Sequence, residues 1–176
     1  PTGDILAASG DGGGVQLWNP ATGEKIRDIP ATLVNSVAFN PTGDILATSS
    51  YGDRVQLWNP STGKKIGDIP VTGTSSVAFN PTGDILATVG SNGTALWDIP
   101  TQRKIGDLPE GRIDVMAFSR DGYTLNVLTA GAPARSWDTG FTVDVVAFLC
   151  SWRKRTSAPE KWTQDVPADL TPQLCP

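Results

Sequence analysis

The feature that most constrains the fold of this sequence is a nearly literal internal repeat. The heptapeptide Pro-Thr-Gly-Asp-Ile-Leu-Ala stands at residues 1–7 and recurs at 41–47 and 81–87. A period of about 40 residues is typical of four-stranded propeller blades and of some helical repeats, so it leaves two architectures to choose between. The tryptophans of successive repeats are spaced 40, 39 and 40 residues apart: Trp18, Trp58, Trp97 and Trp137.

Local patterns within one repeat favour strands over helices. Residues 34–39 form a short segment rich in β-branched side chains, and 44–49 follow a Pro-Thr-Gly turn. Residues 54–58 and 65–69 alternate polar and apolar side chains. Short alternating runs closed by Gly, Pro or Asn are typical of strands, whereas helices need longer runs with a 3.6-residue period. The sequence therefore predicts an all-β chain, a β-propeller of four-stranded antiparallel blades.

Counting strands gives about three and a half to four blades in residues 1–140, with repeats that start near residues 1, 41, 81 and 121. Residues 141–176 break the pattern and are expected to form a C-terminal tail that packs on the propeller. Propellers usually close with about 4 to 8 blades. We therefore expect either the C-terminal part of a larger propeller or a chain that completes its ring with a copy of itself.

The repeat resembles the WD-repeat family. Its motif runs Val-Ala-Phe-Asn-Pro-Thr-Gly-Asp-x-Leu-Ala, followed by Val-Gln-Leu-Trp-Asn and Thr-Gly. The Trp-Asp pair of that family is Trp-Asn in the first two repeats, and its Gly-His pair is absent because Pro30, Pro70 and Pro109 occupy the histidine positions. The resemblance implies a propeller that binds proteins without catalysis, stabilised by apolar packing and by its tryptophans.

The tail resembles the C-terminal segment of actinobacterial WD-repeat signalling proteins. The matching residues are Cys150, Arg155, 157–162, 166–167 and 175–176. The resemblance, together with a capping box from Ser157 to Glu160, favours a helix-loop-helix over residues 142–166. An inner strand within residues 143–150 that completes the first blade is the alternative, and Trp162 is expected to anchor the tail.

The chain has two cysteines, Cys150 and Cys175, and both fall in the tail. Two interpretations stay open. They are either two buried thiols, which a reducing compartment favours, or a disulfide that pins the tail, which the resemblance favours.

Composition excludes several classes of function. The chain has no histidine, which excludes a Ser-His-Asp triad, a Cys-His pair and every metal site that contains histidine. The net charge of -4 argues against binding of a nucleic-acid backbone. No segment has the roughly 18 apolar residues of a membrane-spanning helix. We expect a cytoplasmic protein that is not an enzyme and needs no cofactor or metal.

Three recurring features could belong to a ligand-binding or catalytic site but fit structural roles better. The glycine-rich segment 10–14 coincides with hairpin turns in the later repeats, so a phosphate loop is not favoured. The repeat tryptophans fit packing between blades better than a ligand cage. The recurring aspartates, among them Asp44 and Asp84, fit turns and strand ends better than a calcium site or the active site of a propeller hydrolase.

The favoured function is a protein-protein interaction scaffold within a larger signalling or regulatory protein. A structural, self-assembling propeller unit without a separate ligand is the alternative. A partner is expected to contact residues just before the inner strands, because these residues differ between repeats where the core does not. The candidate partner-binding residues are Thr32, Leu33, Thr72, Thr74, Glu110 and Arg112.

Overall fold

The computed structural model describes residues 3–10, 13–50, 52, 54–91, 93–108, 113–129, 131 and 133–139. Within these residues every regular element is a strand, and the strands form four antiparallel sheets of three or four strands. The prediction of an all-β chain built from propeller-type antiparallel units is therefore confirmed. The expected tail, including Cys150, Cys175 and Trp162, lies outside the described residues.

The first two sheets come from the first two repeats. Sheet 1 has three strands in the order β1-β2-β3, and sheet 2 has four in the order β4-β5-β6-β7. Their bounds are β1 Leu6–Gly10, β2 Gly13–Trp18, β3 Lys25–Ile29, β4 Val34–Phe39, β5 Leu46–Ser50, β6 Val55–Asn59 and β7 Lys64–Ile69.

The last two sheets follow the same plan. Sheet 3 has four strands in the order β8-β9-β10-β11, and sheet 4 has three in the order β12-β13-β14. Their bounds are β8 Thr74–Phe79, β9 Ile85–Gly90, β10 Gly93–Asp98, β11 Arg103–Leu108, β12 Val115–Phe118, β13 Thr124–Leu128 and β14 Arg135–Asp138.

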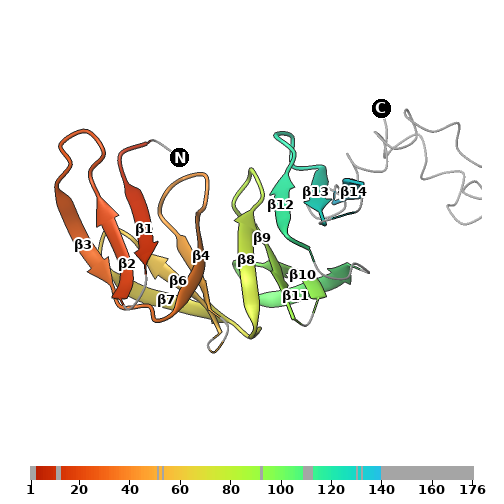
Figure 1. Cartoon of the computed structure of the whole chain (residues 1–176), viewed down its shortest axis with the longest axis horizontal. Helices are drawn as coiled ribbons and strands as arrows, with labels where there is room; N and C mark the ends of the chain where they lie inside the picture. Colours follow the sequence, from red (N-terminus) through yellow and green to blue (C-terminus); the bar gives the residue numbers. More distant parts are fainter. Residues whose placement is uncertain are drawn as a thin grey trace, which may run out of the picture.

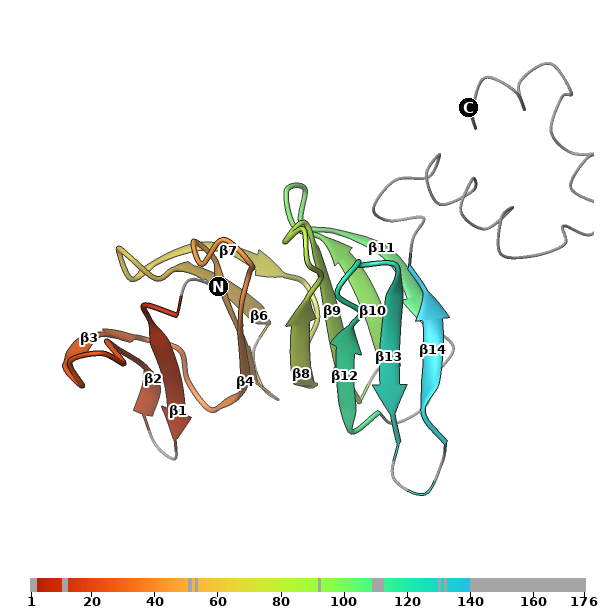
Figure 2. The ribbon, with the colours of Figure 1, turned by 90° about the horizontal axis from the view of Figure 1, so that it is seen from above.

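The sheets follow one another along an arc, each with a face turned toward its neighbour (Figures 1 and 2). The inner strands β4, β8 and β12 lie in sequence along the inside of the arc, and β4 and β12 both contact β8. The outer strands β3, β7 and β11 are edge strands of their sheets. In the described part of the chain the arc does not close into a ring, since sheets 1 and 4 lie apart at its two ends (Figure 1).

Three hydrophobic clusters fill the junctions between neighbouring sheets. The cluster between sheets 1 and 2 contains Leu17, Leu46 and Trp58, and the cluster between sheets 2 and 3 contains Ala47 and Trp97. The third cluster joins sheets 3 and 4 through side chains of β9, β10, β12 and β13. The core is therefore divided among the junctions.

The alternation of side chains along one strand explains how a single sheet serves two junctions. On β5, Leu46 belongs to the cluster with sheet 1 and the next residue, Ala47, belongs to the cluster with sheet 3. Successive side chains of a strand point to opposite faces, so a sheet buried on both faces has apolar residues at consecutive positions. All five residues of β5 are buried.

The turns after the inner strands carry a repeated side-chain network. Asn40 Nδ2 donates to Thr42 Oγ1 (2.9 Å) and to Asp44 Oδ1 (2.6 Å), and the Ile45 amide donates to Asn40 Oδ1 (3.0 Å). Residues 80–85 make the same bonds. The Asn-Pro-Thr-Gly-Asp motif is therefore the turn that returns the chain from β4 to β5 and from β8 to β9.

The Asp44 carboxylate makes the stability of this turn depend on pH. Hydrogen bonds from Thr42 and Asn40 lower the pKa of Asp44. A lowered pKa in the folded state means that the stabilisation is fully present above the ordinary carboxyl pKa of about 4 and is lost as the pH falls through the folded value. We expect Asp44→Asn to lower the melting temperature at pH 7 but to have little effect near pH 2, measured by circular dichroism. Thr42→Val should give the same pH dependence, and an equal loss at both pH values would contradict the assignment.

Candidate functional site

The candidate partner-binding residues lie where the inner strands begin. We call this region the leading end; it comprises residues 30–33 before β4 and residues 70–73 before β8. Thr32 and Thr72 are exposed there, as expected. Glu110 and Arg112 lie outside the described residues.

The expectation that Thr74 is exposed is wrong. Thr74 is 0% exposed and is already the first residue of β8, paired with Gly90 of β9. The equivalent strand of the preceding repeat also begins at the aligned residue, Val34, and both ladders shift register just after this first pair. Thr74 therefore belongs to the strand and not to the loop before it. Asn35 Nδ2 also donates to the Thr74 carbonyl oxygen from the neighbouring inner strand (3.4 Å).

Leu33 is the most unusual residue of the leading end. Its side chain is 78% exposed, the largest fraction among the exposed large hydrophobic residues of the described chain. Its φ of 49° lies in the left-handed region, where a residue with a Cβ is strained. The equivalent residue of the next repeat is Gly73, with a φ of 68°. The backbone of this loop thus requires a conformation that glycine adopts freely, and the chain places a leucine there.

Three of the four repeat tryptophans lie at the junctions between sheets rather than in a ligand cage. Trp58 and Trp97 are each 5% exposed and face the sheet that precedes their own, in the clusters described above. Trp137 packs partly buried against the cluster between sheets 3 and 4. Trp18 is half-buried in sheet 1.

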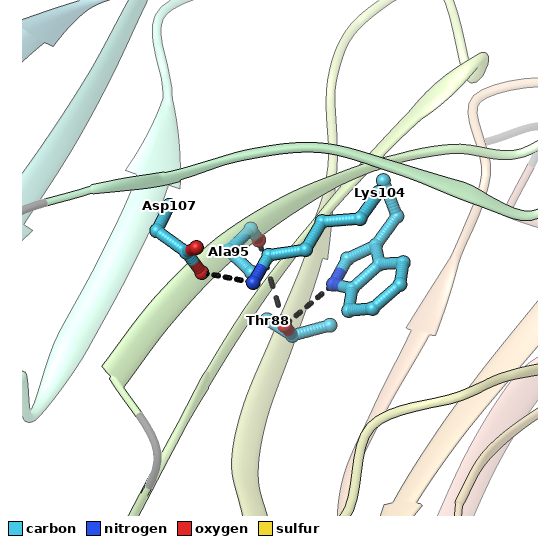
Figure 3. Close-up of polar contacts among 5 residues, drawn as sticks. Thr88, Ala95, Lys104 and Asp107 are labelled. Atoms are coloured by element: carbon cyan, nitrogen blue, oxygen red, sulfur yellow. Dashed lines mark hydrogen bonds and ion pairs between the residues drawn. The ribbon is translucent and has the colours of Figure 1, made fainter.

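Two of these tryptophans have a hydrogen-bond partner that the sequence analysis missed. Trp58 Nε1 donates to Thr48 Oγ1 (3.0 Å), and Trp97 Nε1 donates to Thr88 Oγ1 (2.9 Å; Figure 3). Both threonines are buried. In sheet 4 the position of the threonine is taken by Val127, and the buried Trp137 Nε1 has no partner among the described residues. The recurrence of threonine two residues after Leu46 and Leu86 was the signal that could have revealed the pair.

The aspartates of the repeats are engaged in local contacts. Asp44 and Asp84 lie in the turns after the inner strands, at the end of the sheets opposite the leading end. Asp28, Asp68 and Asp107 on the outer strands form ion pairs with lysines three residues earlier. The described residues hold no group of three or more acidic or cysteine side chains that could bind a metal, and none of their elements is a helix able to cross a membrane.

The fold and the junctions define a propeller-type repeat protein. In agreement with this, the family model of eukaryotic translation initiation factor eIF2A, a propeller-type domain similar to WD40, matches residues 11–97. The match begins just before β2 and ends within β10, so it covers most of sheets 1 to 3. No curated protein matches the chain in sequence.

Proposed function

We propose that the chain is a non-catalytic platform that binds a protein partner at its leading end, with Leu33 as the anchoring side chain. The observation that carries the proposal is the combination of strain and exposure at Leu33. A left-handed conformation costs a residue with a Cβ roughly 1–2 kcal/mol. The exposed side chain gains almost no burial energy that would offset this cost within the fold.

In the proposed complex, the partner protein buries the exposed Leu33 side chain. Backbone strain of this kind clusters at binding sites, where it holds a side chain in a required position. Burying a leucine contributes about 1.5–3 kcal/mol, which is equal to or larger than the strain. Thr32, next to Leu33 in the chain, and Thr72, in the equivalent loop before β8, are exposed polar residues of the kind found at the rim of a protein interface.

The partner in this proposal is a protein and not a nucleic acid, because the chain carries a net charge of -4. A larger, cytoplasmic regulatory protein is the setting that we propose for the platform. The family match favours one narrower candidate, in which the bound protein is a component of translation initiation. A self-assembling unit without a separate ligand is the competing proposal, and light scattering of the purified chain would reveal it as a defined oligomer.

Leu33→Gly should separate binding from folding. We expect the substitution to raise the free energy of unfolding by about 0.5 kcal/mol, because relief of strain outweighs the added chain entropy of glycine. A photo-crosslinking residue at position 32 of the full chain in cells should form a discrete protein adduct, and Leu33→Gly should abolish that adduct. Mass spectrometry of the adduct identifies the partner.

The matched control is a crosslinker at Thr62, an exposed turn residue at the opposite end of sheet 2. The same adduct from both positions, an adduct that survives Leu33→Gly, or an adduct to RNA would each contradict the proposal. Loss of stability in Leu33→Gly would show instead that leucine has a structural role at this position.

A further inference from the structure

The three outer strands share a bulge that turns an isoleucine toward solvent. In β7, Lys65 pairs with Trp58 and Gly67 pairs with Leu57, which leaves Ile66 as the extra residue. The ladders of β3 and β11 shift at the same place and leave Ile26 and Ile105 unpaired. Bulges at sheet edges re-aim the side chain at the extra position. Ile26, Ile66 and Ile105 are 41%, 48% and 39% exposed.

An ion pair spans each bulge. In each strand the lysine before the isoleucine forms an ion pair with the aspartate two residues after the isoleucine. The distance from lysine Nζ to aspartate Oδ1 is 2.7 Å in β3, 2.6 Å in β7 and 2.5 Å in β11. Figure 3 shows the pair between Lys104 and Asp107, with the lysine side chain extended along β11. The three aspartates of the outer strands are therefore all engaged by lysines of their own strands.

Three further cations of the outer strands have no carboxylate partner among the described residues: Arg27, Lys64 and Arg103. Lys64 and Arg103 are exposed. The Arg27 side chain reaches from sheet 1 toward Gly63, which precedes β7 of sheet 2. A Cβ atom added to Gly63 would lie 3.4 Å from the Arg27 side chain. The Nε atom of Arg27 is buried and has no hydrogen-bond partner among the described residues.

Charge is separated across the molecule. The outer strands carry six basic and three acidic residues, whereas the other described residues include three basic and eight acidic ones. The protein as a whole carries a net charge of -4. The rim formed by β3, β7 and β11, which we call the outer rim, is thus a basic surface with exposed isoleucines on an acidic protein.

We propose that the outer rim binds an extended acidic segment of a partner protein that also carries apolar side chains. Free carboxylates of the segment pair with Arg27, Lys64 and Arg103, and its apolar side chains cover the isoleucines. The bulges interrupt the outer edge of each sheet, so the partner makes side-chain contacts instead of adding a strand. This surface is formed by β3, β7 and β11, whereas the leading end is formed by the loops before β4 and β8, and the proposal does not depend on Leu33.

The rim isoleucines give a direct readout of binding. The probe is a peptide that repeats Glu-Glu-Leu, and its matched control repeats Gln-Gln-Leu. With isoleucine methyl groups labelled for NMR, we expect the acidic peptide to shift the signals of Ile26, Ile66 and Ile105 in a saturable manner that weakens with salt. The signals of the buried Ile29, Ile69 and Ile85 should stay in place.

Charge reversal tests the role of the unpaired cations. The double variant Lys64→Glu and Arg103→Glu should raise the Kd for the acidic peptide by about threefold to tenfold, as expected for exposed ion pairs. The double variant Arg54→Glu and Arg120→Glu makes the same change of charge at exposed cations outside the rim and should leave the Kd unchanged.

Four outcomes would overturn the proposal. The first is an equal response to the Gln-Gln-Leu peptide, and the second is no shift of the rim signals at all. The third is a shift of the rim signals by anionic vesicles but not by the peptide, which would assign a lipid surface. The fourth is self-association at low salt that the rim charge reversal abolishes, which would assign a second copy of the chain.

Discussion

Replacing Gly90 with alanine should destabilise the protein by about 3 kcal/mol, the upper part of the usual range for overpacking a well-filled site. A Cβ on Gly90 would lie 2.1 Å from the carbonyl oxygen of Gly73 and 2.9 Å from the Cα of Thr74. Both contacts are with backbone, which cannot rotate away as a side chain can. The expected loss corresponds to a fall in melting temperature of about 6 to 12 °C for a chain of this size, measurable by calorimetry.

Gly106→Ala is the matched control for this substitution. Gly106 also lies in a strand, but a Cβ there would meet no atom within 4 Å. Alanine limits the unfolded chain more than glycine does, so this variant should be stabilised by about 0.4–1 kcal/mol. Equal losses in the two variants would show that the close approach of Gly90 to residues 73–74 does not determine its effect.

The second prediction with a large effect concerns two Thr→Val substitutions in sheet 3, which should change the stability of the protein in opposite directions. Thr88→Val removes the acceptor of the buried Trp97 Nε1 group and should destabilise the protein by about 1–3 kcal/mol. Thr94→Val removes a buried hydroxyl that has no hydrogen-bond partner in the described structure, and should stabilise the protein by about 1 kcal/mol.

The first two repeats support the prediction that Thr94→Val is stabilising. Val15 and Val55 occupy the position of Thr94 in the first two repeats and are fully buried. Denaturant unfolding followed by tryptophan fluorescence would measure both variants. A Thr94→Val variant less stable than the parent would mean that the Thr94 hydroxyl is satisfied, for instance by a buried water.

The sequence was sufficient to predict the strands, because each one combines a two-residue alternation with a turn motif at its end. The four sheets and their antiparallel order follow from the length of the repeat. Sequence was not sufficient to predict which buried threonine of a sheet accepts a hydrogen bond from the tryptophan. Thr88 and Thr94 are both buried threonines of sheet 3, and only the pairing of Trp97 with the strand that carries Thr88 distinguishes them.

The candidate site was only partly predictable for a similar reason. Thr32, Leu33 and Thr72 are exposed because they lie in the loops that precede β4 and β8, outside the paired part of either strand. Thr74 was misplaced because it was assigned to the loop before β8, although it aligns with Val34, the first residue of the strand predicted in the preceding repeat. The strain at Leu33 could have been suspected from its alignment with Gly73, but the sign of φ is a property of the folded backbone.

The division of the core into separate junctions has a consequence for how this protein responds to damage. Among the described residues no cluster spans more than two sheets, so within this part of the chain each sheet is coupled directly only to its immediate neighbours. The stability of such a protein approximates a sum of nearest-neighbour terms, as in a one-dimensional lattice. A substitution in sheet 1 therefore reaches sheet 4 only through the two sheets between them. One end of the arc can open and close while the other keeps its structure.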